Sequence, residues 1–230
     1  MGNESGVWIM HGAEDTTRDL ILNADELTNY VNRVGFLPLF ANKIKGFSVE
    51  EHALAKYWWT GDRLRDPWEW RMQIAGEHRL AYGKFFDGRA GFVSLEWLGR
   101  FANARRDGYD FDSLNEEGLC SARLKKIMDC FNCKEELFSF DIKRMAGFGK
   151  NGEKNFEGAM TYLQNRLYIV ISDFGRRVNK KGEPYGWNVA MFSKPEDIWG
   201  KEIFSKAYEE PPEQSRAALE AQLNLCFNKR

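Results

Sequence analysis

Apolar residues recur at every third or fourth position from Ser121 to about residue 167, and capping and turn residues interrupt the pattern twice. This spacing predicts three helices: one starting at Ser121, one at 139–145 and one at about 154–167. Two apolar, β-branched runs at 167–171 and 187–192 predict the strands of a long hairpin. Three helices followed by a hairpin are the order of elements in a winged helix-turn-helix, which contacts DNA.

The third predicted helix has one apolar and one polar face. The apolar face carries Phe156, Ala159, Met160, Leu163 and Leu167. The opposite face carries cationic, amide and hydroxyl groups that suit the edges of bases in a major groove, namely Lys154, Asn155, Thr161, Tyr162 and Asn165. Gln164 falls on the flank of the apolar face, which favours packing or contact with the hairpin. A solvated helix face would give the same pattern, so the helix alone leaves both interpretations open.

Basic residues concentrate on the same part of the chain. Residues 143–181 contain nine basic and three acidic residues, a local balance of +6 in a chain whose formal charge is −1. Four of the cations fall in the turn-rich segment at 172–186 between the two predicted strands, namely Arg176, Arg177, Lys180 and Lys181. Positive charge gathered on a helix and a hairpin is what phosphate contacts require, so double-stranded DNA is the predicted partner.

The residues before 119 predict helices around a small antiparallel sheet. Asn23 and Glu26 form a capping box for a first helix, and Ser48 with Glu51 predicts a second, short helix towards residues 58–59. These signals place two helices ahead of the sheet.

The sheet is predicted from alternation and from a turn. Residues 68–74 alternate between apolar and polar, which predicts a strand. An Asp-Gly turn at 87–88 joins two further strands at 81–86 and 90–93, and Ser94 caps a helix that runs to about residue 106.

These elements predict an α+β fold in four parts. A winged helix-turn-helix unit packs beside an N-terminal helical and small-sheet subdomain, for which a second, degenerate winged helix is left open. The parts are a loosely ordered arm at 1–19, the N-terminal subdomain at 20–118, the winged unit at 119–197 and C-terminal helices at 198–230 that pack on the body.

Composition favours a cytoplasmic protein with a packed core. Hydrophobic residues make up 43% of the 230 residues, which is ample for a core. The sequence shows neither a run of about 18 apolar residues nor a secretory signal, so no membrane partner is predicted. Cys130 and Cys133 form a C-x-x-C without the second pair that structural zinc needs. We therefore expect free thiols and neither a metal nor another cofactor.

Aromatic and cationic residues gather between positions 58 and 71. A wall able to stack an unpaired base or hold an anion could be formed by Trp58, Trp59, Trp68, Trp70 and Arg71. Core packing beside solvated cations is the alternative interpretation, and the sequence favours it. The three histidines fall in no motif with a Ser or Cys nucleophile, so no catalytic residue is predicted.

Five segments resemble a group of uncharacterised bacterial proteins described as AlkZ-related. The segments are Val34 to Phe40, Pro67 to Trp70, Ala81 to Phe86, Arg105 to Asp112 and Asn179 to Trp187. The likeness covers most of residues 20–200. The group is remotely similar to the winged-helix DNA glycosylases that release alkylated bases and unhook interstrand crosslinks. The resemblance therefore implies a winged-helix fold and a role in DNA repair.

One segment departs from the pattern of those glycosylases. They carry a Gln-x-Gln or Gln-x-Asp pair that positions the attacking water just after a junction between a helix and a glycine. The matching place here follows Gly35 and offers Leu37, Pro38, Leu39 and Phe40. None of these side chains can orient a water molecule or act as a base. The resemblance thus implies that this glycosylase chemistry is lost.

Together these observations predict a DNA-binding protein without glycosylase activity of the Gln-x-Gln type. Two alternatives remain open. One is a glycosylase that acts on alkylated or crosslinked bases through a rearranged site, and the other is a winged-helix scaffold that binds proteins. The sequence leaves open whether the protein is an enzyme, although a non-catalytic role is favoured, and it does not predict the oligomeric state.

Overall fold

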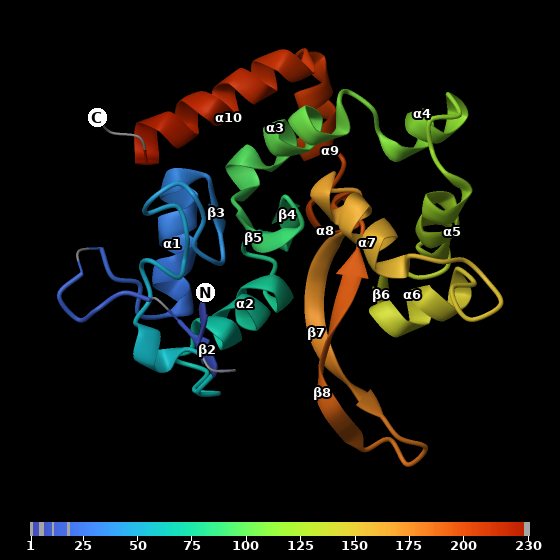
Figure 1. Cartoon of the computed structure of the whole chain (residues 1–230). Coiled ribbons are helices and arrows are strands. Elements are labelled where there is room, and N and C mark those ends of the chain that lie inside the picture. The colour runs from blue at the N-terminus through green and yellow to red at the C-terminus, as the bar shows by residue number, and fades with distance from the viewer. Residues whose placement is uncertain (1, 5–6, 11, 18, 228–230) are drawn as a thin grey trace.

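The structure is a computed structural model that describes residues 2–4, 7–10, 12–17 and 19–227. It has an α+β fold, in which helices pack around one antiparallel sheet of strand order β3-β5-β4-β7-β8-β6 (Figure 1). The strands of this sheet are β3 (Phe36–Pro38), β4 (Ala81–Phe86), β5 (Arg89–Val93), β6 (Glu136–Phe138), β7 (Val170–Val178) and β8 (Pro184–Ser193). A separate hairpin near the N-terminus consists of β1 (Gly2–Glu4) and β2 (Val7–Ile9).

The helices divide between the two halves of the chain. The first half contains α1 (Ala24–Val34), the 3-10 helix η1 (Ala55–Tyr57), α2 (Pro67–Gly76), α3 (Leu95–Arg106) and α4 (Phe111–Glu116). The second half contains α5 (Ala122–Cys130), α6 (Ser139–Met145), α7 (Phe156–Asn165), α8 (Pro195–Trp199), α9 (Glu202–Ser205), η2 (Lys206–Glu209) and α10 (Pro212–Phe227). Among the described residues, no helix is long and apolar enough to cross a membrane.

The six-stranded sheet is shared by both halves of the chain. Strands β3, β5 and β4 come from the first half, whereas β7, β8 and β6 come from the second. The two sets meet where β4 pairs with β7, with Tyr82 opposite Ile171. We call this pairing the seam. The boundary expected near residue 118 stays a prediction. The sheet contains strands from both sides of that boundary, so the two parts share one sheet.

Two buried clusters of apolar side chains lie on either side of this seam. One contains residues of α1, α2, α3 and the β3-β5-β4 strands, and the other contains residues of α5, α6 and α7. The segment that leads into β7 supplies both clusters: Leu167 and Val170 belong to the first, and Tyr168 and Ile169 to the second. The start of β7 therefore holds the two halves together.

The strand predicted at 68–74 is wrong, because these residues form helix α2. Asp66 is its N-cap and accepts a hydrogen bond from the Trp68 backbone N–H at 2.8 Å, and Pro67 occupies the first turn. Trp70 and Ile74 are buried one helical turn apart. In a short segment, apolar residues at every second position can also lie on one face of a helix. The Asp66-Pro67 pair, which starts a helix, was therefore the more informative signal.

The short helix predicted from Ser48 towards residues 58–59 is wrong over its first part, although its capping contacts form, and only the 3-10 helix η1 (Ala55–Tyr57) forms near its end. The Ser48 hydroxyl donates to Glu51 Oε2 at 2.6 Å, and the Glu51 backbone N–H donates to Ser48 Oγ at 3.2 Å. The neighbouring N–H groups of Val49 and Glu50 instead donate to the carbonyls of Pro38 and Leu39. These tertiary hydrogen bonds hold the segment in turns beside the end of β3.

The segment predicted as a long loop between the hairpin strands is mostly strand. Strand β7 continues to Val178, β8 begins at Pro184, and these two residues pair. Asn179 closes the short turn, since its Oδ1 accepts from the backbone N–H groups of Lys181 and Glu183. Exposure on both faces removes the apolar alternation that would have marked these strands.

The segment expected as a loosely ordered arm, 1–19, contains the β1–β2 hairpin, and part of it is attached to the body. The Ala13 backbone N–H donates to the Ala53 carbonyl at 2.9 Å, and the Ala13 side chain is buried. Residues 1, 5–6, 11 and 18 of the predicted arm lie outside the described residues. From Ala13 onwards, part of the segment is therefore fixed by hydrogen bonds.

Candidate nucleic-acid interface

The outer half of the β7–β8 hairpin extends away from the rest of the protein (Figure 1). It carries the four cations predicted for phosphate contact, and all four are exposed. Arg176 Nε donates to the Gly186 carbonyl at 2.9 Å, and the Arg177 guanidinium lies 4.6 Å from the centre of the Phe140 ring. Lys180 and Lys181 occupy the turn. The two arginines are thus steadied by the protein, while their charge remains accessible to solvent.

Large apolar side chains share this exposed tip. Trp187 is 91% exposed, Val178 63% and Tyr185 48%. An indole ring in water contributes almost nothing to the stability of the fold, because it buries little surface. Sequence reasoning missed these residues because it interpreted Trp187 as an ordinary strand position. Gly186 and Asn188 on either side of it were the available signal of exposure.

Helix α7 is the third helix predicted from the sequence, and its N-terminus is exposed. Asn155 is the N-cap, with φ +61°, and its Oδ1 accepts from the Gly158 backbone N–H at 3.2 Å. Lys154 is exposed and its Nζ donates to the Lys150 carbonyl at 2.9 Å. These two members of the predicted polar face are therefore open to a ligand, although Asn155 already uses its side-chain oxygen.

The other three members of that face are half-buried: Thr161 and Asn165 contact the first half of the chain, and Tyr162 packs against the cluster of the second half. Asn165 Oδ1 accepts from Arg105 at 3.3 Å, and the Arg166 guanidinium covers the Tyr162 ring at 4.7 Å. A methyl group of Thr161 faces Gly88, in the turn between β4 and β5. The predicted polar face is thus not one open surface. Helical periodicity could not reveal that β4 and α3 cover its C-terminal part.

Gln164 joins the two halves of the chain. It is 2% exposed, and its Oε1 accepts from the Lys84 backbone N–H of β4 at 3.2 Å. Its Nε2 donates to the Met160 carbonyl one turn earlier in α7, also at 3.2 Å. The flank position inferred from the sequence corresponds to a packing role, in which a buried amide has both of its polar atoms bonded.

The residues of the predicted aromatic wall divide between core and surface. Trp70 is 1% exposed and its indole N–H donates to the Leu64 carbonyl at 2.9 Å. Trp58 is also buried, whereas Trp59 is 43% exposed. Trp68 packs partly buried against the core. The tryptophans therefore do not line one open wall.

Arg71, the cation of the predicted wall, is enclosed by aromatic rings. Its guanidinium lies 3.7 Å from the Trp68 ring centre and 4.4 Å from that of Phe174 in β7. Burial lowers the pKa of Arg71, and the neighbouring Tyr82 partly offsets this effect. Burial likewise raises the pKa of Tyr82. The stack supports the base of the hairpin from the side of α2.

A cleft of about 580 Å³ lies between α2 and the base of the hairpin. Glu69 and Gln73 line it on the α2 side, and Asp173 and Phe174 line it on the hairpin side. A β-carbon added at Gly76 would meet Asp173 Oδ1 at 2.7 Å, so the glycine makes room for this carboxylate beside α2. Carboxylate and carboxamide groups can orient a water molecule or accept a proton. The cleft thus offers polar groups that could take part in chemistry.

The segment that follows Gly35 has no such groups. Leu37 and Leu39 are fully buried, and Pro38 lies at the end of β3, which pairs with β5. Phe40 packs near Trp58 and Trp68, with ring centres 5.7 and 6.4 Å apart. This segment is therefore apolar core. Among the described residues, no group of three or more His, Cys, Asp or Glu side chains is arranged to hold a metal ion.

The chain matches the family model described as "AlkZ related" over residues 21–230, and it belongs to this family. No curated protein matches it. Among solved structures, it is similar to Streptomyces sahachiroi DNA glycosylase AlkZ, with 9% sequence identity and a TM-score of 0.47. The similarity covers 90% of this chain and 52% of that one, so this chain spans about half the length of the glycosylase.

Proposed function

We propose that the protein binds double-stranded DNA, and that its main contact is the outer half of the β7–β8 hairpin. The observation that carries the proposal is a projecting ribbon on which four cations stand beside a Trp that is 91% exposed. Cations neutralise phosphates, and an exposed aromatic ring can enter a groove or stack on a base. Membership of the AlkZ-related family supports a function connected with DNA.

In this proposal, helices α5, α6 and α7 with the β7–β8 hairpin act as a winged helix in which the wing dominates binding. Lys154 and Asn155 at the start of α7 add contacts, because they are exposed. Thr161 and Asn165 contribute indirectly by fixing α7 against the β4–β5 turn and α3, and Tyr162 by packing against the cluster of α5, α6 and α7. DNA binding of this kind needs no catalytic group.

The test is binding of a labelled duplex measured by fluorescence anisotropy over a series of salt concentrations. We expect log affinity to fall linearly with log salt, by about 0.9 per phosphate neutralised. The double variant Arg176→Glu/Arg177→Glu should bind much more weakly, and its slope should be smaller by roughly 2. A matched control is Lys43→Glu/Lys45→Glu, which reverses two exposed charges far from the hairpin in sequence and should keep most of the affinity. Equal loss in both variants would mean non-specific attraction, and no binding at low salt would favour a protein-binding scaffold.

A second candidate function is base excision through a rearranged site, and the cleft between α2 and the hairpin is the observation that favours it. Asp173 and Gln73 would take the role of orienting water that the segment after Gly35 cannot fill. Incubation with an alkylated duplex, followed by detection of abasic sites, would test this function. Product from the wild type but not from Asp173→Asn would support it, and a wild type that gives no product would eliminate it.

A further inference from the structure

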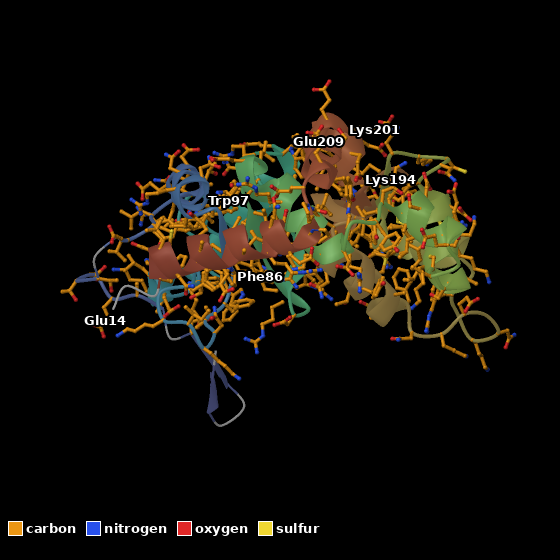
Figure 2. All side chains as sticks on the ribbon, turned by 90° about the horizontal axis from the view of Figure 1, so that it is seen from above. Glu14, Phe86, Trp97, Lys194, Lys201 and Glu209 are labelled. Atoms are coloured by element: carbon orange, nitrogen blue, oxygen red, sulfur yellow. The ribbon has the colours of Figure 1, made fainter. Side chains whose placement is uncertain are left out.

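A second cavity, of about 380 Å³, lies among α4, α5 and the segment from α8 to η2, and the proposed DNA contact does not use it. Helices α4 and α5 form one wall, and residues from α8 to η2 form the other. Figure 2 shows Lys194, which precedes α8, and Lys201, which lies between α8 and α9; both line this cavity. A volume of this size is suited to a small molecule.

Aromatic rings line the inner part of this cavity. Phe111 and Tyr168 meet edge to face, with ring centres 5.3 Å apart. Phe204 and Tyr208 extend this surface from the opposite wall. The Arg106 guanidinium lies 4.9 Å from the Tyr168 ring centre and 5.1 Å from that of Phe204, so it fixes the rings of both walls. Tyr168 and Phe204 are each 2% exposed and support the half-buried rings of Phe111 and Tyr208, which face the cavity and on which an aromatic ring can pack.

In the described part of the chain, charges of both signs line the cavity, and six of the nine are already paired with one another. Lys125 pairs with Asp129 at 2.8 Å, and Lys194 pairs with Asp197 at 3.5 Å. Arg106 and Glu196 form another pair at 2.6 Å.

Three charges remain outside these pairs: Asp110 and Asp112 on the α4 wall and Lys201 on the other. Asp110 is the N-cap of α4, and its Oδ1 accepts from the Ser113 backbone N–H at 2.7 Å. Asp112 of α4 and Lys201 beside α9 have no side-chain partner among the described residues. In an aromatic-lined cavity, Asp112 therefore offers a carboxylate that makes no helix-capping bond, and Lys201 on the other wall offers an unpaired ammonium group.

We propose that this cavity binds a small aromatic zwitterion, an amino acid with an aromatic side chain or a close analogue. The ammonium group of the ligand pairs with Asp112, its carboxylate pairs with Lys201, and its ring packs against Phe111. A ligand with only one charge would leave the other wall unpaired and would bind less tightly. A nucleic acid does not suit the site, because carboxylates outnumber cations along its lining.

The experiment is isothermal titration calorimetry of the whole chain with L-phenylalanine, phenethylamine and 3-phenylpropionate. Phenethylamine lacks the carboxylate and phenylpropionate lacks the ammonium group. We expect each of these to bind at least roughly tenfold more weakly than phenylalanine. Lys201→Gln should weaken phenylalanine and leave phenethylamine unchanged. Asp112→Asn should weaken phenylalanine and leave phenylpropionate unchanged. Both residues are exposed, so neither change should affect folding.

Lys180→Gln is the matched control, because it removes an exposed lysine from the hairpin. It should leave phenylalanine binding intact while it weakens DNA binding, and Lys201→Gln should do the reverse. Failure of this proposal is thereby separated from failure of DNA binding. The proposal is wrong if phenylalanine does not bind at millimolar concentration, if phenethylamine binds as tightly, or if neither variant changes the affinity.

Discussion

The β7–β8 hairpin has a base, where β7 begins and β8 ends, and a tip, around the turn at 179–183. The same antiparallel pairing runs through both, but their side chains differ in burial. At the base, Val170, Ser172 and Phe192 are buried, and the Ser172 hydroxyl donates to Glu136 Oε1 of β6 at 2.6 Å. Towards the tip, Val178 and Trp187 project into solvent. Packing explains the apolar residues of the base, but nothing in the fold requires those of the tip. The tip therefore points to an external partner, and the base does not.

The arginines near the hairpin repeat this contrast. Arg106 is 1% exposed and donates to the carbonyls of Arg166 and Leu167, just ahead of β7, and to Glu196 and Tyr208. Burial alone would lower the pKa of Arg106, but Glu196 and Tyr208 outweigh it and raise the pKa. Arg176 makes one side-chain hydrogen bond and stays exposed. A fully bonded cation stabilises the fold, whereas an exposed cation is free to bind phosphate.

The largest expected effect comes from removing the cation at the base. Arg106→Met should lower the free energy of unfolding by roughly 3–5 kcal/mol, because Glu196 and two backbone carbonyls lose their buried donor. Urea denaturation followed by circular dichroism measures this change. Arg100→Met is the control, since Arg100 is half-exposed in its 3.2 Å pair with Glu210 and should cost less than about 1 kcal/mol. A loss of similar size in both variants would contradict the structural role given to Arg106.

The next effect concerns affinity rather than stability. Trp187→Ala should weaken duplex binding by roughly 5- to 100-fold, because one stacked or groove-inserted ring is lost, and should leave the melting temperature unchanged. Trp187→Phe should retain most of the affinity. Trp59→Ala removes another exposed indole, outside the hairpin, and serves as control. If DNA binding survives Trp187→Ala intact, the cations alone make the contact.

The smallest effect is a pH dependence at the base. Burial raises the pKa of Tyr82 above its ordinary 10.0, so folding favours the neutral phenol. The stabilisation that Tyr82 contributes is fully present below pH 10.0, and it is lost as the pH rises through the higher pKa of the folded state. Tyr82→Phe should therefore lose less thermal stability than wild type between neutral and strongly alkaline pH. Tyr185→Phe at the exposed tip should follow the wild type, and identical curves for all three proteins would contradict this account.

Local signals in the sequence identified much of the fold. The α+β class is confirmed, and the N-cap predicted at Asn23 forms, with its Oδ1 accepting from the Glu26 backbone N–H at 2.9 Å. The Glu26 carboxylate reaches the backbone N–H of Leu22, one residue before the position expected in a capping box. The strand predicted at 68–74 failed because a short alternating pattern outweighed the Asp-Pro start of a helix. Local periodicity also cannot show which face another element covers. For that reason Asn165, although correctly placed on the polar side of α7, is bonded to Arg105.

The candidate site was only partly accessible from sequence. The cations of the hairpin follow from composition and turn residues, and their contact with DNA stays a prediction. The enclosure of Arg71 depends on a contact across more than 100 residues of chain, and the exposure of Trp187 depends on no other segment covering it. Phe174 reaches Arg71 only because β7 pairs beside β4. No pattern within either segment alone carries that information.

The seam between β4 and β7 has a consequence for how the protein can be divided experimentally. A fragment of residues 119–197 would turn β7 into an edge strand and would uncover Leu167 and Val170, which are fully buried here. An unpaired edge beside apolar side chains is a template for aggregation. The fragment of residues 119–197 should therefore be poorly soluble. If it failed to bind a ligand, the cause could be self-association rather than the loss of binding residues.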